Sequence, residues 1–437
     1  MAYFCYNNAM KKRRWHLHIP WPRLLLWAYA GSVAAFYGLL WWRALPDEAR
    51  APAPCGGGSD GEQAKTRARG KKAVSIIVPA RNEERNIGRN VTSLLEQDFA
   101  GDYEVIVVDD ASTDATPRIL DEIASTHPHA ERLYVLRLRD LPPGWAGKPH
   151  ALHAGTQEAQ GDWLLFTDAD TWHAPCALRT AYETAQSEGI DMLSLGTAQE
   201  LPGFWDKVLM PMAYLGISMQ YPVRQVNNPR SPLALANGQF ILLRRSVYDL
   251  IGGYARLDLR ATLLDDRDLA RVVKENGFRL RLLDGRNLVR VRMYEGLAEA
   301  WRGWRKNVFL GSRGGAGFAL LQLFGLPITT IFPFLLPLLA LLAWRRDTRD
   351  RRGQKAGRKR EGVTPVEITA ASALGLVPLL AYRAWVNKNM GVPWYYAFTH
   401  PLAGAIFAGI LGQSTWRVLT GKGVDWRGRQ YYRETDG

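Results

Sequence analysis

Cysteine is scarce in this sequence. The 437 residues include three, Cys5, Cys55 and Cys176, which are scattered and odd in number. They indicate neither a disulfide framework nor a zinc site. No internal repeat is evident. A glycine-rich triphosphate loop is also missing near the first strand-like run, where "VPARNEERN" stands, and this argues against a nucleotidyltransferase.

Acidic residues are outnumbered by basic ones. Lys and Arg total 56 and Asp and Glu total 42, which gives a formal net charge of +14. Such an excess indicates an anionic partner: nucleic acid, a membrane surface or a phosphorylated substrate. Part of it is local, because "RRDTRDRRGQKAGRKR" at 345–360 carries nine cations against two Asp beside very apolar sequence. A membrane-flanking patch fits this placement better than a DNA-binding face, so no nucleic acid partner is expected.

The chain contains long uncharged runs, and the first lies near the N-terminus. Residues 24–42, "LLLWAYAGSVAAFYGLLWW", form a nineteen-residue stretch of bilayer length with tryptophans near its ends. A cleaved signal peptide is the alternative, but the stretch is long for one and ends in bulky Trp. We expect residues 1–43 to be an N-terminal tail and transmembrane anchor. A flexible linker rich in Pro, Gly and charge is expected at 44–72.

Three further apolar stretches lie at 318–344, 365–385 and 395–411. They predict a C-terminal membrane region at 311–416, followed by a basic tail at 417–437. Prolines 327, 333 and 337 in the first stretch favour a broken hairpin that enters and leaves the membrane on one side, with two spans after it. The basic segment 345–360 would then lie on the same side as the soluble domain. A simple span is the alternative.

Residues 73–310 make up the predicted soluble domain. The runs "VSIIVPA", "YEVIVVDD", "RLYVLRL" and "DWLLFTDAD" are short and β-rich, and helix-like segments separate them. This alternation predicts an α/β fold with a mostly parallel sheet and helices on both faces. In such sheets ligands bind at the carboxyl ends of the strands, which is where this sequence places its acidic residues.

Two groups of polar residues follow the first two predicted strands. The first group is Pro79, Arg81, Asn82 and Glu83, and the second is Asp109 and Asp110. Either aspartate has the chemistry to accept the imide hydrogen of a uracil or the hydroxyls of a ribose. Taken singly, each group has an ordinary explanation as a helix cap or as charge that favours the helix dipole.

Two more groups follow along the chain. Lys148 in "WAGKPHALHAG" stands at an apparent helix start, where a cation and free backbone donors suit a diphosphate. Asp168 and Asp170 in "LLFTDADTWH" close a strand-like run, and two carboxylates one residue apart can hold a hard divalent cation. A solvated charge and a solvated turn are the alternatives. The common position of all four groups at strand ends makes a joint coincidence improbable.

Together these motifs resemble those of inverting family 2 glycosyltransferases with a GT-A fold. The resemblance covers residues 74–310 and rests on "SIIVPARNEERNI", "VVDDASTDAT", "GKPHALHAG", "FTDADT" and "LLDDRDLARVVKENGFRL". It implies that Asp110 helps to hold the nucleoside, and that Asp168 and Asp170 engage a nucleotide diphosphate bound to Mg²⁺ or Mn²⁺. It also implies that Asp266 is the catalytic base, with Asp265 where Glu is usual.

One departure from the family bears on the product. Processive polysaccharide synthases of this family usually carry Gln-x-x-Arg-Trp after the base, whereas "EAWRGWRKNVF" at 299–309 lacks the Gln. Trp304 and Arg305 could still form an aromatic and cationic platform near the leaving diphosphate, with an interfacial amphipathic helix as the alternative. The missing Gln favours transfer of a single sugar. "LPPGWAGK", "GWRKN" and "VDWRGRQY" are most similar to bacterial enzymes of hopanoid and carotenoid glycosylation.

These observations predict a multi-pass cell-membrane protein with a cytoplasmic catalytic domain. It would transfer one sugar from a nucleotide-sugar donor, UDP-linked by preference, to a lipid or polyprenol acceptor with the help of a divalent metal. Polymer synthesis and transfer to polyprenyl phosphate stay open within the enzyme class. A nucleotide-sugar-binding scaffold subunit is the non-enzyme alternative. The sequence specifies neither the sugar nor the acceptor.

Overall fold

The computed structural model describes residues 21–44, 72–310, 315–353, 362–420, 422–426 and 429–433. The predicted N-terminal tail and almost all of the predicted linker therefore lie outside the described residues. The chain divides into two compact units. One comprises residues 1–38 and 332–379, and the other comprises residues 39–331 and 380–437.

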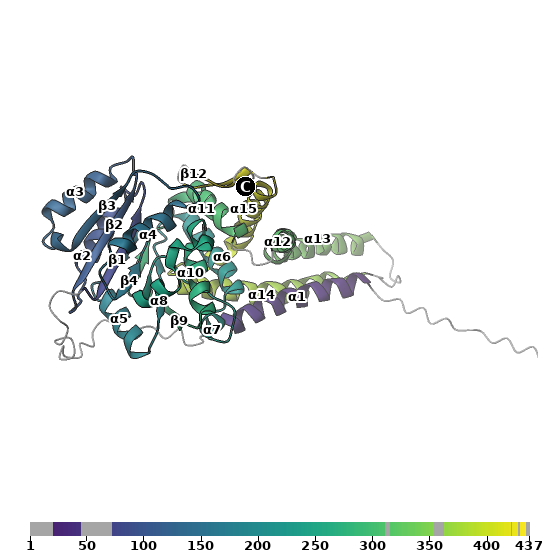
Figure 1. Ribbon diagram of the computed structural model, residues 1–437. Coiled ribbons are helices and arrows are strands. Elements are labelled where there is room, and N and C mark those ends of the chain that lie inside the picture. The colour runs from purple at the N-terminus through teal and green to yellow at the C-terminus, as the bar shows by residue number, and fades with distance from the viewer. Residues whose placement is uncertain are drawn as a thin grey trace, which may run out of the picture. The chain divides into compact units, whose positions relative to one another are not determined.

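A seven-stranded sheet is the centre of the second unit, in the order β3-β2-β1-β4-β8-β6-β9 (Figure 1). Its strands are β1 (Val74–Ala80), β2 (Tyr103–Asp110), β3 (Leu133–Leu138), β4 (Trp163–Phe166), β6 (Met192–Gly196), β8 (Ile241–Arg244) and β9 (Leu280–Asp284). All neighbouring pairs are parallel except those of β8, which runs antiparallel to β4 and β6. The predicted α/β class with a mostly parallel sheet is confirmed.

Helices cover both faces of this sheet because its central strands are apolar on both sides. Ile76 and Val78 of β1 join one buried cluster, while Ile77 between them joins the other. The first cluster includes side chains of α2 (Ile87–Leu95), α3 (Thr116–Thr126) and α5 (Ala177–Ser187). The second includes side chains of α4 (Gly147–Glu158), α8 (Arg245–Leu250) and α10 (Asp265–Glu275).

The remaining elements of the sheet domain are short except for α6. They are the 3₁₀ helices η2 (Ala130–Arg132) and η3 (Gly253–Ala255), the helices α6 (Phe204–Gln220), α7 (Val223–Asn227) and α9 (Leu257–Arg260), and a small sheet of β5 (Thr171–His173), β10 (Val289–Val291) and β7 (Ala198–Gln199). The helix that follows β1 begins at Ile87, four residues after Glu83. The residues before it form a turn whose backbone N–H groups donate to side chains of the next strand's loop.

The C-terminal elements are α11 (Gly296–Leu310), α12 (Gly315–Thr330), α13 (Phe332–Gly353), α14 (Pro365–Asn389), η4 (Trp394–Thr399), α15 (His400–Leu419), β11 (Lys422–Trp426) and β12 (Arg429–Arg433). Regular structure extends into both of the predicted basic regions. The basic segment that begins at Arg345 is helical as far as Gly353, as the last turns of α13. The predicted basic tail contains the antiparallel pair β11 and β12, which its charge-rich composition did not indicate.

One cysteine among the described residues takes part in a crosslink. Cys176, directly before α5, is 6% exposed and disulfide-bonded. Cys5 and Cys55 lie outside the described residues. A single crosslink is not a framework, and three scattered cysteines carry no signal for which of them pair.

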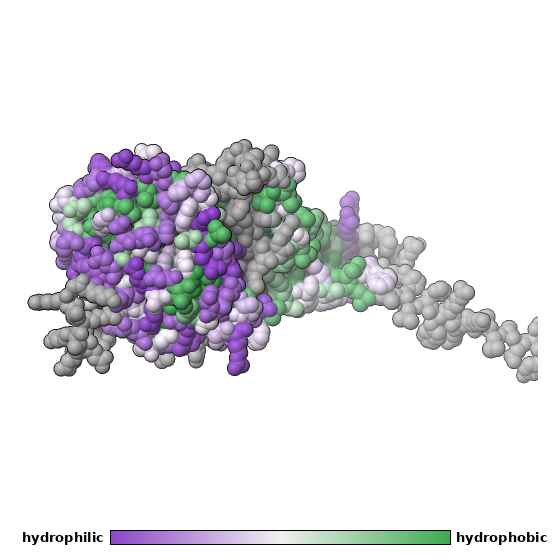
Figure 2. All heavy atoms as spheres, in the orientation of Figure 1, coloured by the Kyte–Doolittle hydropathy of each residue, from purple (hydrophilic) through white to green (hydrophobic). Residues whose placement is uncertain are grey.

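Two single helices among the described residues are long and apolar enough to cross a membrane. They are α1 (Trp21–Ala44), over its residues Trp21–Arg43, and α14. A third candidate is the pair Gly317–Thr330 and Phe332–Arg349, which is bent by 42° at a short break. Over the last predicted stretch, 395–411, α15 is not among these candidates. Figure 2 shows hydrophobic residues on the surface of the C-terminal helices and mostly hydrophilic ones over the sheet domain.

Helices α1 and α14 pack side by side in the first unit. The guanidinium Nε of Arg23 lies 3.1 Å from a carboxylate oxygen of Glu367. Ten residues further along α1, Val33 stands beside Gly375, where an added Cβ would meet its side chain at 3.7 Å. Contacts that advance in the same sense along both helices show that the two helices are parallel.

The same direction holds in the second unit, where both helices end. The ring of Trp41 stacks on that of Trp385, with centroids 6.3 Å apart and 27° between the ring planes. Where α1 and α14 both cross a membrane, a parallel pair fits one crossing between them, whereas the predicted hairpin fits an antiparallel pair. The bent pair of α12 and α13 is apolar enough for either a broken span or a re-entrant segment, so the hairpin stays a prediction.

Candidate active site

The turns after β1 and β2 lie next to each other at one edge of the sheet. The register pairs Pro79 with Val108 and brings Asp109 opposite the end of β1. Arg81 follows β1, and its Nη1 donates to the backbone carbonyl of Asp110 at 2.6 Å and lies 3.8 Å from a carboxylate oxygen of the same residue. Asp109 and Asp110 are each 4% exposed. The structure therefore brings the first two predicted groups together.

Hydrogen bonds between the two turns fix their shape. The side-chain Oδ1 of Asn82 accepts from the backbone N–H of Thr113 at 2.8 Å. The N–H of Glu83 donates to the hydroxyl of Thr116 at 2.8 Å. Asn82 and Ala111 have φ values of 53° and 54°, a left-handed conformation that is uncommon for residues other than glycine. Strain of this kind is held where the surrounding structure requires it, which often marks a binding turn.

Lys148 is the centre of a cluster of carboxylates. It lies in the first turn of α4, and its Nζ is 2.7 Å from Oδ1 of Asp168 and 3.3 Å from Oδ2 of Asp265. Burial alone would lower the pKa of Lys148, but the charges of Asp168, Asp265 and Asp266 outweigh it and raise the pKa above its ordinary value. Lys148 is therefore a permanent cation at the site.

Asp266 lies beside this lysine at the start of α10. Its Oδ2 accepts the backbone N–H of Gly238 at 3.1 Å, and its Oδ1 accepts the N–H of Arg267 at 2.7 Å. Each oxygen keeps a further lone pair, and the residue is half-buried, whereas Asp265 is 6% exposed. Asp266 is thus the more accessible acid of the pair.

Asp268, the third acid in the first turn of α10, has a structural role. Its Oδ1 accepts from the guanidinium Nε of Arg267 at 2.9 Å, and its Oδ2 accepts from the hydroxyl of Thr262. These contacts close the start of the helix onto the preceding turn.

Gly238 limits the space inside the cluster. It precedes β8, and a Cβ added there would lie 3.1 Å from Nζ of Lys148 and 3.5 Å from Oδ2 of Asp266. Any side chain at this position would therefore push the lysine or the aspartate aside. Gly238 is not among the site residues predicted from the sequence, although an Asn-Gly pair shortly before a strand is a turn signal.

A buried polar network holds the segment that contains Asp168 and Asp170. The side-chain amide of Asn90 donates to the carbonyls of Asp168 and Thr171, at 3.1 and 3.0 Å. The hydroxyl of Thr171 donates to the carbonyl of Asp168 at 2.8 Å and lies 2.9 Å from Nε2 of His173. Asn90, Thr171 and His173 are each at most 2% exposed. Sequence reasoning missed them because buried polar residues within apolar runs carry no distinctive pattern.

The donor set suits a divalent cation that is completed by substrate. Among the described residues no group of three His, Cys, Asp or Glu side chains could hold a metal by itself. Mg²⁺ is commonly bound by one or two carboxylates together with substrate phosphates, and Asp168 and Asp170 provide that number. Because Lys148 already neutralises Oδ1 of Asp168, Asp170 is the better ligand of the two.

Trp304 and Arg305 lie elsewhere in the unit, on α11. Trp304 is 7% exposed and belongs to an apolar cluster with side chains of α6 and α15. Its ring centroid is 5.9 Å from that of Phe407. The carbonyl of Arg305 accepts from the hydroxyl of Ser414 at 2.7 Å. No contact among the described residues joins Trp304 to the carboxylates, so its place in the sugar-binding site stays a prediction.

The fold and the site define an α/β enzyme domain in which acidic groups and one lysine meet at the carboxyl edge of a mostly parallel sheet. Residues 75–252 match the family model described as Glycosyl transferase family 2. The chain therefore carries a family 2 glycosyltransferase domain, as its motifs predict.

Known relatives share this domain. Beta-monoglucosyldiacylglycerol synthase of Synechocystis sp. is 30% identical over 252 residues, which cover 57% of this chain and 48% of that protein. The chain thus spans about half the length of that relative. The 4,4'-diaponeurosporenoate glycosyltransferase of Staphylococcus aureus is 25% identical over 396 residues, which cover 84% of this chain and 91% of the relative. Among solved structures, mannosyltransferase PcManGT from Pyrobaculum calidifontis aligns with a TM-score of 0.47 and 20% identity, over 88% of this chain and 98% of that one.

Proposed function

We propose that the protein transfers one sugar from a nucleotide-sugar donor, UDP-linked by preference, to a lipid acceptor at the membrane. The observation that carries this proposal is the cluster of Lys148, Asp168, Asp265 and Asp266 at the carboxyl edge of the sheet. Two relatives named for a diacylglycerol product and for diaponeurosporenoate support a lipid acceptor. The candidate membrane helices also favour an acceptor that lies in a membrane.

Each residue of the cluster has a distinct task in this proposal. The turn of Arg81, Asn82 and Glu83, with Asp109 and Asp110, holds the nucleoside. Lys148 faces the diphosphate and offsets the charge that develops on it as the sugar leaves. Asp170, with Asp168, would hold Mg²⁺ or Mn²⁺, which supplies further charge stabilisation to the leaving group when bound.

Asp266 removes the proton from the acceptor hydroxyl. The hydroxyl oxygen forms the new bond to the anomeric carbon while the bond to the diphosphate breaks, and the proton passes to the Asp266 carboxylate. A single displacement without a covalent nucleophile inverts the anomeric centre. A cytoplasmic position of the domain follows from the location of nucleotide-sugar pools and is part of this proposal.

The full-length protein in detergent, incubated with radiolabelled nucleotide sugars and a membrane lipid extract, tests the proposal. We expect label in a chloroform-soluble product from one donor, with the opposite anomeric configuration by NMR. Label that stays in an acid-precipitable polymer would favour a polysaccharide synthase. Donor binding without any transfer across the whole panel would favour a scaffold subunit.

A further inference from the structure

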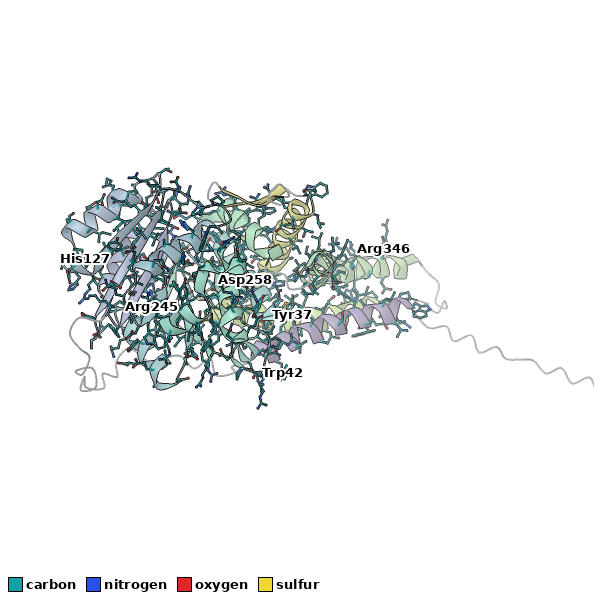
Figure 3. The ribbon with its side chains drawn as sticks, in the orientation of Figure 1. Tyr37, Trp42, His127, Arg245, Asp258 and Arg346 are labelled. Carbon is teal, nitrogen blue, oxygen red and sulfur yellow. The ribbon has the colours of Figure 1, made fainter. Side chains whose placement is uncertain are left out.

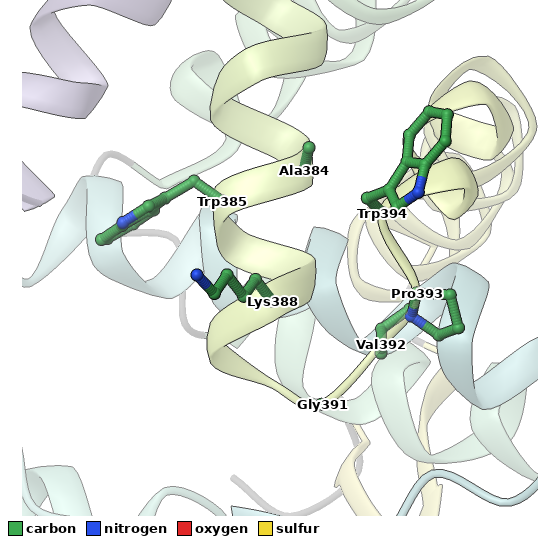
Figure 4. Close-up of a pocket in the computed structure, with 7 residues that line it drawn as sticks. All are labelled: Ala384, Trp385, Lys388, Gly391, Val392, Pro393 and Trp394. Carbon is green, nitrogen blue, oxygen red and sulfur yellow. The ribbon is translucent and has the colours of Figure 1, made fainter.

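A cavity of about 620 Å³ lies at the corner between the end of α14 and η4. Its lining residues are Ala384, Trp385, Lys388, Gly391, Val392, Pro393 and Trp394. Figure 4 shows Trp385 and Lys388 leaving α14 on the same side, with Trp394 across the turn from Ala384. All but one of the side chains that line it are apolar or aromatic, and Lys388 supplies the single charge.

The ammonium of Lys388 has no ion pair with any of the described residues. Lys388 is exposed in the last turn of α14, and no carboxylate of the described chain lies against it. The neighbouring carbonyl of Asn389 is already occupied, because it accepts from Nη1 of Arg286 at 2.7 Å. That arginine pairs with Asp284 at the end of β9, so this corner is tied directly to the edge of the catalytic sheet.

The corner follows a helix that is long and apolar enough to cross a membrane and reach its lipid headgroups. The 25 residues of α14 extend about 37 Å at 1.5 Å each, which exceeds a hydrocarbon core of about 30 Å. Trp394, Tyr395 and Phe398 follow with 66%, 55% and 57% of their surface exposed. Exposed aromatic rings of this kind gather at membrane–water interfaces. The stacked Trp41 adds a ring from the end of α1.

We propose that this corner, α14 with η4, binds one phospholipid with an anionic headgroup. The phosphate lies at Lys388, and the glycerol and first acyl carbons lie against Trp385, Pro393 and Trp394. A zwitterionic lipid is the poorer ligand because it carries its own ammonium toward Lys388. Through Arg286 the bound lipid fixes the edge of the catalytic sheet at the membrane surface. This binding site is separate from the carboxylate cluster and does not depend on which sugar is transferred.

Native mass spectrometry of the full-length protein in detergent micelles tests this site with two probes, dioleoyl phosphatidylglycerol and dioleoyl phosphatidylcholine. We expect one phosphatidylglycerol to be retained in preference to phosphatidylcholine. Lys388→Gln should weaken its binding by about five-fold, the effect of one lysine near an anionic lipid. Trp394→Ala should weaken the binding of both lipids. The matched controls are Arg346→Gln and Trp344→Ala, which remove an exposed cation and an exposed indole from α13.

Two results would overturn the proposal. One is equal retention of the two lipids by the wild-type protein. The other is a loss of phosphatidylglycerol binding in Arg346→Gln as large as the loss in Lys388→Gln. That result would show only a general attraction of the lipid to basic helices. Trp394→Phe keeps an aromatic ring at this position and should retain lipid. This variant therefore tests the contribution of the ring even if Trp394→Ala does not fold. Sugar transfer is measured in parallel, and its absence would contradict the proposed function without touching this site.

Discussion

Nζ of Lys148 lies 2.7 Å from Oδ1 of Asp168, although the lysine opens α4 and the aspartate follows β4. The lysine also contacts Asp265 at 3.3 Å. One cation thus joins the residues predicted for the diphosphate with those predicted for the base. Its raised pKa, which the three neighbouring carboxylates cause against the effect of burial, keeps it charged throughout the physiological range.

Replacing Lys148 with Met should weaken donor nucleotide binding by about 10- to 100-fold, the range for loss of a hydrogen bond to a charged group. The substitution also leaves the buried carboxylate of Asp265 without its cation, so some loss of stability is expected. Lys148→Arg should recover part of the affinity. Isothermal titration with UDP measures the binding, and Lys207→Met on α6 is the control. Unchanged affinity in Lys148→Met would separate this lysine from the diphosphate.

Asp266→Asn should bind donor with near-normal affinity yet lose about two to four orders of magnitude in transfer rate, because Asn accepts no proton. The side-chain oxygen of Asn can still accept the backbone N–H of Gly238. Single-turnover kinetics with a saturating donor measure the step. Asp249→Asn, an exposed aspartate that pairs with Arg245, is the control. Retention of most activity in Asp266→Asn, or a product with the donor's anomeric configuration, would contradict the assignment of the base.

Removal of divalent metal by EDTA should abolish transfer, and Mg²⁺ or Mn²⁺ should restore it. The reason is that Asp168 and Asp170 by themselves repel the donor diphosphate. Asp170→Asn should weaken nucleotide binding in the presence of metal, but leave binding in EDTA unchanged. Equilibrium dialysis with and without metal makes the comparison. Full turnover in EDTA would show that the two carboxylates hold no catalytic metal.

Acid should destabilise the network behind Asp168 through His173. Burial lowers the pKa of His173 from its ordinary 6.5 to about 3. Between these values the unfolded chain binds a proton that the folded chain does not, so stability is present above pH 6.5 and is lost as the pH falls toward 3. The loss is of the order of 4 kcal/mol at the lower limit. His173→Gln keeps a hydrogen-bonding side chain and should flatten the melting temperature between pH 6.5 and 4. If the melting temperature fell equally with pH in the wild-type protein and in His173→Gln, the acid sensitivity would not come from His173.

If the bent pair of α12 and α13 crosses the membrane once, the parallel direction of α1 and α14 predicts that the chain segments before the two helices lie on one side of the membrane, opposite the catalytic domain. Single cysteines introduced at positions 15 and 357 in a background without other cysteines should therefore show equal labelling by a membrane-impermeant maleimide in intact cells. A cysteine at Ser125 of the sheet domain should show the reverse. The basic run "KKRR" at 11–14 and the basic segment 345–360 would then lie opposite a cytoplasmic domain, against the positive-inside tendency. Labelling of position 357 together with position 125 would favour the predicted hairpin.

The sequence by itself determined the elements and the edge of the sheet that bears the site. Runs such as Val74–Ala80 are apolar on both sides, which only a strand covered on both faces satisfies. The residues that follow such strands then meet at one edge, so Asp109, Asp110, Asp168 and Asp170 could be selected from local pattern alone. Gly277, with φ of 82°, directly follows the C-cap of α10, a position where glycine is common.

Tertiary structure decided which of these groups touch. Lys148 lies on α4, Asp168 follows β4 and Asp265 begins α10. Their contacts depend on how these three elements pack, and no local sequence pattern encodes that packing. Gly238 matters only because β8 brings it against Asp266, and Asn90 only because α2 packs beside β5. The direction of α14 relative to α1 likewise rests on pairs such as Arg23 with Glu367, far apart in the chain. Periodicity and charge describe one segment at a time, whereas a site is a set of distances between segments, and packing alone sets those distances.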